Sequence, residues 1–221
     1  MANHNKLYKE KEYWDHRYEN EDSYDWFKSY DDFKNVLKDH MDKNDKILIL
    51  GCGNSPFSLD LYKDGYKNVT NVDYSTVCIE NMKQKYQNLS EMSWYVMDIT
   101  NLQFEASTFD VVIDKGTLDA LLVEENDVWN ISETAFETME AVLRNVSTVL
   151  KVGGRFVSIT FSQPHFRKKI LARSKFNWDV QTFSIGDSGC FEYFLYVMTK
   201  GKELSKEDKQ FELKSKQSRS E

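Results

Sequence analysis

The chain has 221 residues, a net charge of −7 at pH 7 and 40% hydrophobic residues, which is enough for one domain with a sizeable core. The acidic balance argues against a broad basic surface for nucleic acid and favours a basic partner, such as a lysine-bearing protein surface. No apolar run approaches the length of a membrane span, and no signal-peptide pattern opens the chain. The chain has three cysteines, Cys52, Cys78 and Cys190. Their odd number indicates reduced thiols, so we expect a cytoplasmic protein, and because they lack metal-ligand spacing we expect no metal site.

Strands and helices alternate along most of the chain, as the hydrophobic period indicates. Apolar residues at 33–41 have helical spacing, and an apolar strand at 46–50 runs into a glycine turn at 51–53. A helix from about 55 to 65 and a strand at 69–72 follow, and Ser75 can then cap a further helix. Strands are expected at 94–97 and 109–113, before a long amphipathic helix from about 134 to 150 that Gly153 and Gly154 break.

The last third of the chain predicts a change of strand direction. A fifth strand at 155–160 precedes two more, near 178–183 and 191–198, and residues 186–189 have the composition of a hairpin turn. The alternation predicts a parallel sheet, whereas the hairpin makes one strand antiparallel. We therefore expect an α/β, Rossmann-like fold with a seven-stranded, mostly parallel sheet, an antiparallel terminal strand and helices on both faces. Residues 201–221 are polar and charged, and we expect a solvated tail that is either flexible or partly helical.

The glycine turn and the residues at the strand ends predict a site for a nucleoside. Glycines let the backbone approach a ligand, and Asp73, at the end of the second strand, can accept hydrogen bonds from ribose hydroxyls. Ligands bind at the carboxyl ends of parallel strands, so Gly51, Asp73, Asp98 and Asp114 should converge on one crevice. Pro56 stands where a dinucleotide motif has its third glycine, which argues against a pyrophosphate ligand.

Four short motifs, together with the antiparallel last strand, carry a resemblance to a known family. They are EYWDHRY at 12–18, YDWF at 24–27, LGCGNS at 50–55 and DKGTLDA at 114–120. The chain resembles class I S-adenosylmethionine-dependent methyltransferases over residues 12–200, and specifically the group of elongation factor 1-alpha lysine methyltransferases. The resemblance implies one methyltransferase domain at 1–200, with a lid at about residues 8–30. It also implies S-adenosyl-L-methionine as cofactor, S-adenosyl-L-homocysteine as product, and a lysine of translation elongation factor 1-alpha as methyl acceptor.

The same resemblance assigns residues to the cofactor. Aromatic side chains of the lid would cover the methionine end, where ring faces suit a sulfonium cation and N–H or O–H groups suit its carboxylate. An acid and the next backbone amide after the third strand would meet the adenine. Tyr74 either lies against the adenine or belongs to the core. The cofactor-binding residues expected are Trp14, Tyr18, Trp26, Gly51, Asp73, Tyr74, Asp98, Ile99 and Lys115.

The segment after the fourth strand is where we expect the reaction. It takes the place of the Asn/Asp-Pro-Pro-Tyr type segment of many amine methyltransferases. A lysine acceptor must arrive neutral and in line with the methyl group, so positioning is the main contribution expected. Lys115 would repel the acceptor and is assigned to the cofactor side, whereas Asp119 either contacts the acceptor or caps a helix. The catalytic residues expected are Asp114, Lys115, Gly116, Thr117, Leu118 and Asp119.

Three functions remain open from the sequence. The first is protein-lysine methylation of elongation factor 1-alpha, with neither a membrane nor a nucleic acid as direct partner. The second is methylation of a small molecule or an RNA, because the fold does not fix the acceptor. The third is a scaffold that binds the cofactor without activity.

Overall fold

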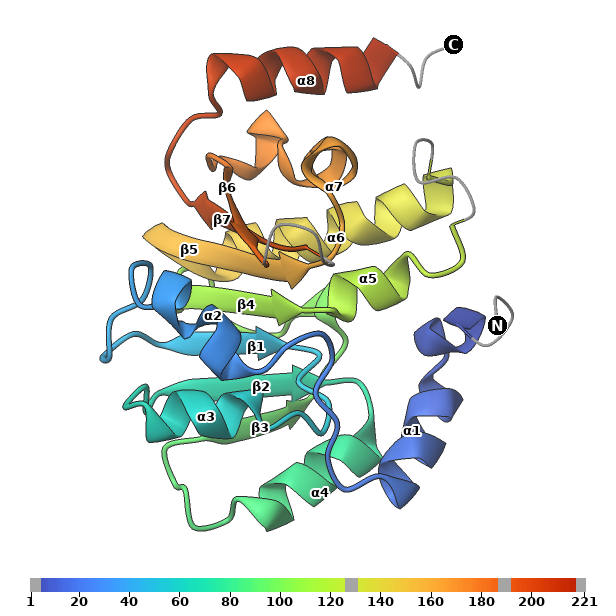
Figure 1. Cartoon of the computed structure of the whole chain (residues 1–221), viewed down its shortest axis with the longest axis vertical. Coiled ribbons are helices and arrows are strands. Elements are labelled where there is room, and N and C mark those ends of the chain that lie inside the picture. Colours follow the sequence, from blue (N-terminus) through green and yellow to red (C-terminus); the bar gives the residue numbers. More distant parts are fainter. Residues whose placement is uncertain (1–4, 126–130, 187–191, 218–221) are drawn as a thin grey trace.

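A seven-stranded sheet forms the centre of the molecule. The computed structural model describes residues 5–125, 131–186 and 192–217 (Figure 1). The strand order is β3-β2-β1-β4-β5-β7-β6, and the five strands from β1 to β5 pair in parallel. The strands are β1 (Ile47–Leu50), β2 (Val69–Asp73), β3 (Ser93–Val96), β4 (Phe109–Lys115), β5 (Leu150–Thr160), β6 (Gln181–Ile185) and β7 (Tyr193–Thr199).

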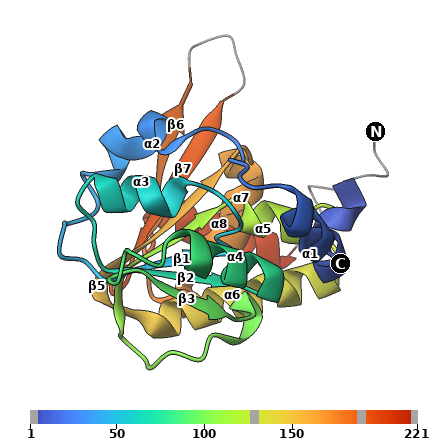
Figure 2. The ribbon, with the colours of Figure 1, turned by 90° about the horizontal axis from the view of Figure 1, so that it is seen from below.

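Helices cover both faces of this sheet, because alternate strand residues point to opposite sides. Figure 2 shows α2 and α3 on one side of the sheet and α6 on the other. In β1, Leu48 and Leu50 belong to the core beneath α6, whereas Ile47 and Ile49 belong to the core beneath α2 and α3. The helices are η1 (Asn5–Lys9), α1 (Lys11–Asn20), α2 (Tyr30–Leu37), α3 (Phe57–Lys63), α4 (Thr76–Lys85), η2 (Ile99–Asn101), α5 (Thr117–Leu121), α6 (Glu133–Val149), α7 (Pro164–Leu171), η3 (Ser174–Phe176) and α8 (Lys206–Gln217).

The fold class predicted from the sequence is confirmed. The one antiparallel strand is β7, the last in sequence, which pairs antiparallel with both β5 and β6. In space β7 lies between these two strands, so the edge of the sheet is β6. The parallel strands all point toward the side where α1 and α5 lie, and this side therefore collects the strand ends (Figure 1).

Some boundaries differ from the prediction. The long helix ends at Val149, and β5 begins at once with Leu150 and runs through the glycine pair that we expected to separate them. β5 can continue through the glycines because it bulges there, as the register shift opposite Phe109 and Val111 of β4 shows. A Cβ on Gly154 would lie 2.9 Å from the Asp110 carbonyl oxygen, so the bulge needs glycine.

The strand expected near 178–183 also begins later. Trp178 makes only an isolated bridge with Lys200, and β6 starts at Gln181. The hairpin turn expected at 186–189 lies outside the described residues except for Gly186. Within the described parts of the chain, no helix combines the length and the apolar character that a membrane crossing requires.

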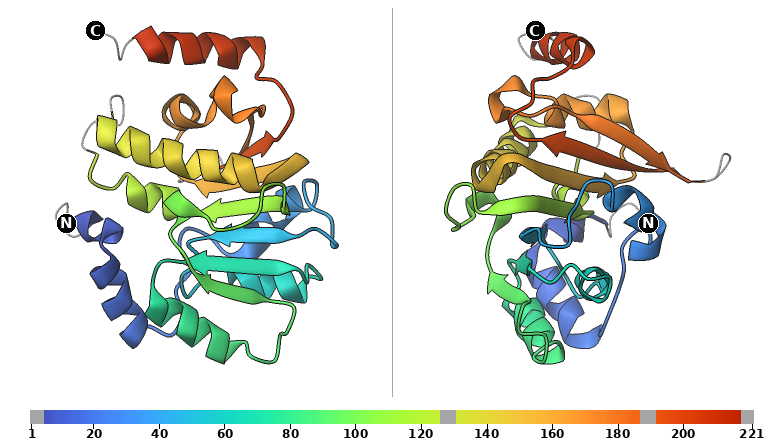
Figure 3. Two further views of the ribbon diagram at one scale, coloured as in Figure 1. Left: turned by 180° about the vertical axis from the view of Figure 1, so that it is seen from behind. Right: turned by 90° about the vertical axis from the view of Figure 1, so that its left-hand side faces the viewer.

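The C-terminal segment takes the helical alternative, and it packs against the fold where we expected a solvated tail. It forms helix α8 at the end of the molecule opposite α4, beyond α7 (Figure 3). Asp208 is buried and accepts from Lys168 of α7 at 2.9 Å, and Glu212 accepts from Ser174 at 2.8 Å. These bonds fasten α8 to the rest of the fold, so its polar residues are not simply solvated.

Candidate cofactor pocket and active site

One large pocket lies at the carboxyl ends of the parallel strands. Its volume is about 920 Å³, and its wall combines the lid, the glycine turn and residues from β2, η2, α5 and α7. All nine residues predicted to bind the cofactor line it: Trp14, Tyr18, Trp26, Gly51, Asp73, Tyr74, Asp98, Ile99 and Lys115. The structure therefore brings them together, while their individual contacts with a ligand stay predictions.

The glycine turn after β1 has a conformation that only glycine adopts without strain. Gly51 and Gly53 have φ angles of +56° and +53°. A Cβ on Gly51 would lie 2.4 Å from Thr117 Oγ1, and a Cβ on Gly53 would lie 3.0 Å from Tyr18 Oη. The turn is thus packed between the lid and α5, and its backbone forms part of the pocket wall.

Asp73 lies at the end of β2 and holds the turn in place. Its Oδ2 accepts from the Gly53 amide and its Oδ1 from the Ser75 amide, both at 3.0 Å. Each oxygen keeps a further lone pair, so a ribose diol can still donate to this carboxylate. Burial raises the pKa of Asp73 to about 6, although the two backbone hydrogen bonds oppose this shift. Ser75 also caps α4 as predicted, because its hydroxyl accepts from the Cys78 amide.

The lid (residues 8–30) closes one side of the pocket with stacked and edge-on rings. Trp14 stacks on Tyr18 at 5.7 Å, and Trp26 meets Trp14 edge-on at 5.9 Å between ring centroids. The Trp14 Nε1 group donates to the Tyr8 carbonyl, so we correct the expectation that this N–H serves a cofactor carboxylate. Its ring remains on the pocket wall, where it suits a cation.

Polar bonds attach the lid to the strand ends, and sequence reasoning missed their central residue, Asp25. Its Oδ1 accepts from Lys115 Nζ at 2.6 Å and from Ser55 Oγ at 2.7 Å. Lys115 also donates to the Trp26 carbonyl at 2.5 Å. Burial lowers the pKa of Lys115, against the effect of Asp25. The ammonium group of Lys115 therefore binds the lid through Asp25 and Trp26.

The adenine end combines an acid and a short helix. Asp98 precedes η2 and its Oδ1 accepts from the amide and the hydroxyl of Thr100, both at 2.8 Å. This oxygen therefore caps the start of η2. Asp98 remains exposed on the pocket wall, beside the buried Ile99. Tyr74 is half-buried there and also packs against the core, so both of its predicted roles are compatible with its position.

Only part of the segment predicted to be catalytic lies on the pocket wall. Lys115, Gly116, Thr117 and Asp119 line the pocket. Asp114 and Leu118 do not, because both are fully buried. Asp114 accepts from the Leu118 amide at 3.0 Å and from Ser158 Oγ at 2.7 Å, so it fixes the start of α5. These two residues support the segment from beneath and do not form the pocket wall.

Asp119 lies on the pocket wall, on helix α5. Its Oδ1 accepts from Thr160 Oγ1 at 2.6 Å and from Arg167 Nη2 at 2.5 Å. Burial raises the pKa of Asp119, whereas Arg167 and Thr160 act in the opposite direction. Arg167 was missed by sequence reasoning, because it lies 48 residues away on α7 and belongs to no local motif.

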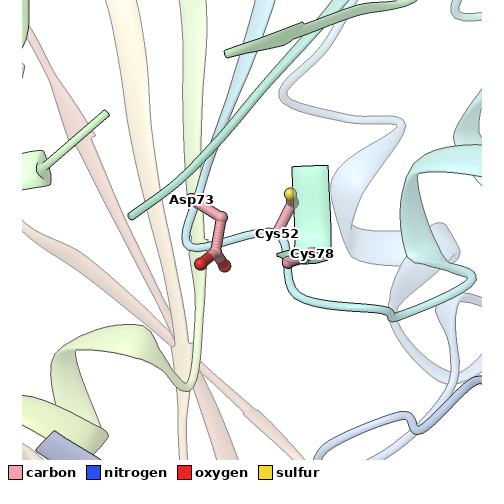
Figure 4. A group of neighbouring side chains, drawn as sticks. All are labelled: Cys52, Asp73 and Cys78. Carbon is pink, nitrogen blue, oxygen red and sulfur yellow. The ribbon is translucent and has the colours of Figure 1, made fainter. Parts of the chain in front are cut away.

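Two thiols lie next to the ribose acceptor. Figure 4 shows Cys52 and Cys78 beside Asp73, and their sulfur atoms and one carboxylate oxygen lie within 4.8 Å of one another. Burial raises the pKa of Cys52, and the hydrogen bond to Cys52 together with burial raises the pKa of Cys78. Metals bind thiolates, so protonated thiols make this group a poor metal site. The absence of a metal stays a prediction.

Comparisons with known proteins agree with this geometry. A family model described as a methyltransferase domain matches residues 41–211. The chain is 41% identical over 201 residues to EEF1A lysine methyltransferase 4 of Bos taurus and 42% identical over 203 residues to that of Mus musculus. Each match covers 90% of this chain and 78% of the relative. The eEF1A lysine and N-terminal methyltransferase of Mus musculus is 35% identical, and the chain matches 26% of its length.

Solved structures agree on the fold. The N-methyltransferase NodS from Bradyrhizobium japonicum, in complex with S-adenosyl-L-homocysteine, superposes with a TM-score of 0.62 at 16% identity, covering 86% of this chain and 98% of that chain. The predicted family and cofactor are thereby confirmed, and the glycine turn, the paired Asp73 and the aromatic lid fit that cofactor. The chain belongs to the S-adenosylmethionine-dependent methyltransferase family, in the group that contains the EEF1A lysine methyltransferases.

Proposed function

We propose that this enzyme methylates a lysine side chain of translation elongation factor 1-alpha. The observation that carries the proposal is the similarity over 90% of the chain to two proteins named for that activity. The pocket supports it, because one continuous wall joins the cofactor residues to Asp119. Its volume of about 920 Å³ is at the upper end of typical small-molecule sites, which leaves room for an acceptor beside the cofactor.

The residues of the pocket have separate tasks in this proposal. Bound S-adenosylmethionine supplies a methyl group on a sulfonium, which the acceptor nitrogen takes while sulfur keeps the bonding electron pair. Asp73 and Asp98 hold the nucleoside, and the lid excludes water from the methionine end. Asp119 accepts a hydrogen bond from the acceptor amine and orients it. A side chain that fixes the acceptor in line contributes more than any change in its intrinsic reactivity.

The acidic chain is consistent with a protein acceptor that presents lysine. We keep the expectations that neither a membrane nor a nucleic acid is a direct partner and that the enzyme works in the cytoplasm. A small-molecule or RNA acceptor and an inactive scaffold are the other outcomes that an experiment must separate.

The test is incubation of the full chain with labelled S-adenosylmethionine and purified elongation factor 1-alpha, followed by mass spectrometry of its lysines. We expect methylated lysine on that protein. Label in RNA or in a small molecule of a cytosolic extract, with none on elongation factor 1-alpha, would replace the proposed acceptor. No turnover on any extract component would favour the scaffold.

A pair of matched variants tests the role of Asp119. Asp119→Asn keeps the size of the side chain and removes its charge, and we expect turnover to fall on the order of a hundredfold while cofactor affinity stays within about twofold. Asp31→Asn is the control, because Asp31 is exposed, lies outside the pocket wall and forms its ion pair with Lys34 on α2. Equal turnover in both variants would remove Asp119 from the reaction.

A further inference from the structure

The ion pair between Asp119 and Arg167 is unusual for its burial and for what it leaves unpaired. The Arg167 side chain is 1% exposed and that of Asp119 is 11% exposed. Among the described residues, five buried side-chain polar atoms have no hydrogen-bond partner, and three of them belong to this pair: Asp119 Oδ2, Arg167 Nε and Arg167 Nη1. Buried polar groups are normally satisfied, so such a concentration at a pocket wall indicates a functional rather than a structural pair.

The bonds of the pair are asymmetric. Arg167 Nη2 donates to Asp119 Oδ1 at 2.5 Å and to Thr160 Oγ1 at 3.1 Å, and Thr160 donates to the same Oδ1 at 2.6 Å. One carboxylate oxygen is thus held by two donors while the other has no partner. This arrangement fixes the orientation of the carboxylate on the pocket wall.

The charges around the pair show why a buried cation is needed here. Burial, together with the nearby carboxylate of Asp119 from α5, raises the pKa of the buried Asp114 of β4 to about 6. Tyr196 of β7 also faces the pair and has its pKa raised, chiefly by burial, so it is a neutral phenol at neutral pH. Arg167 is the cation that opposes the charge of both carboxylates in these interactions.

We propose that Arg167 is a positioning residue for methyl transfer, which keeps the buried carboxylate of Asp119 ionised and fixed in place on the pocket wall where the acceptor amine binds. The proposal rests on the proposed function, in which Asp119 contacts the acceptor. Without a cation, a carboxylate so buried takes up a proton, so that it loses its charge and one of its oxygens becomes a donor in place of an acceptor for the amine. An Asp119 carboxylate without Arg167 that stayed charged would also hold the acceptor as an unreactive ammonium, because an unbalanced negative charge raises the pKa of a neighbouring amine.

The test compares Arg167→Met, Arg167→Lys and Asp119→Asn in the full chain. For Arg167→Met we expect kcat at pH 7 to fall about tenfold or more, with cofactor affinity unchanged and the acidic limb of the pH–rate profile moved up by about one unit. Arg167→Lys retains the cation and should keep the wild-type pH profile. Adding Arg167→Met to Asp119→Asn should cost less than about twofold further, because the two residues act as one unit.

A measurement without substrate separates this inference from the proposed function. The carboxyl ¹³C signal of Asp119, assigned by its loss in Asp119→Asn, is titrated in the wild type and in the Arg167 variants. We expect the titration midpoint to rise by about one unit or more in Arg167→Met and to stay near the wild-type value in Arg167→Lys. A midpoint unchanged in both variants overturns the inference, whichever acceptor the enzyme uses.

Two further outcomes also decide the matter. A uniform loss of rate at every pH in Arg167→Met, with an unchanged Asp119 titration, assigns Arg167 to structure alone and overturns the proposal. If Arg167→Met does not fold, Arg167→Lys and Arg167→Gln take its place in the titration. Arg167→Gln should then show the raised midpoint, and the absence of any rise contradicts the proposal.

Discussion

At the scale of single residues, Asp73 makes the response of the pocket to pH predictable. Its carboxylate already accepts from two backbone amides, and burial raises its pKa to about 6. Above that pH it is ionised and can accept from both ribose hydroxyls, whereas below it a proton occupies one acceptor position. We therefore expect the Kd for S-adenosylmethionine to be constant above pH 7 and to rise about tenfold per pH unit below 6. Calorimetric titration between pH 5 and 8 measures this.

A matched variant shows whether Asp73 is the group responsible. Asp73→Asn should cost about 1.5–3 kcal/mol of cofactor affinity and should remove the pH dependence. The control is necessary because Asp114 also has a pKa raised to about 6, although its carboxylate lies under α5 and off the pocket wall. A pH dependence that survives in Asp73→Asn would assign it to Asp114 or to another group.

Residues in local motifs could be predicted from the sequence, and residues that meet through the fold could not. Gly51, Gly53 and Asp73 follow two apolar strands at short spacing, so their convergence is a consequence of parallel pairing. Asp25 reaches Lys115 across 90 residues, and Arg167 reaches Asp119 across 48. Nothing in the local composition of 164–171 indicates a buried cation, because the segment reads as an amphipathic helix.

At the scale of elements, the lid combines ligand cover with core packing. Trp14 and Tyr18 are buried with residues of β1 and α4, while Trp26 and Tyr8 pack against them. Asn54 donates to the Glu21 carbonyl at 2.8 Å, which fastens the lid to the glycine turn. By contrast, α2 is a permanent part of the layer that covers the sheet, because its Phe33 and Leu37 are fully buried in the core between this helix and the sheet.

These boundaries sharpen a truncation experiment. Removal of residues 1–28 keeps Ser29, whose capping box with Asp32 starts α2. We expect a folded protein with a lower Tm, because Trp14 and Tyr18 leave the core, and with cofactor affinity reduced on the order of a hundredfold, since each lost contact costs about 1 kcal/mol or more. Thermal unfolding and calorimetric titration of the truncated chain measure the two effects.

The truncation needs a comparison with a variant that changes the lid by a single group. Tyr18→Phe removes a single hydroxyl that lies against Gly53 and leaves the ring stack with Trp14 in place. We expect it to bind the cofactor nearly as well as the wild type. A truncated chain that folds and binds with wild-type affinity would show that the lid serves packing alone.

At the scale of the whole molecule, most of the fold could be predicted from the order of strands and helices along the chain. Alternating strands and helices fix a parallel sheet with helices on both faces, and the last hairpin fixes the direction of β7. Its place between β5 and β6 did not follow from the sequence, because strand order depends on which edges are free when the final hairpin docks. The packing of α8 was missed for a similar reason: Asp208 pairs with Lys168 of α7 and Glu212 with Ser174 of η3, both distant in sequence.

The charge of the whole chain leads to a prediction about substrate capture. A net charge of −7 attracts a lysine-bearing protein surface over distances that salt screens, with a Debye length of about 10 Å at 0.1 M and about 3 Å at 1 M. We expect the KM for elongation factor 1-alpha to rise several-fold between about 0.05 M and 0.5 M salt, while kcat changes little. Steady-state kinetics at fixed, saturating cofactor measure both values.

The Kd for S-adenosylmethionine, titrated in the same buffers, is the reference, because contacts inside the pocket are screened much less than long-range attraction. A KM that does not respond to salt, or that changes only in parallel with this Kd, would mean that the acidic balance plays no part in recognition and that shape at the pocket mouth selects the acceptor.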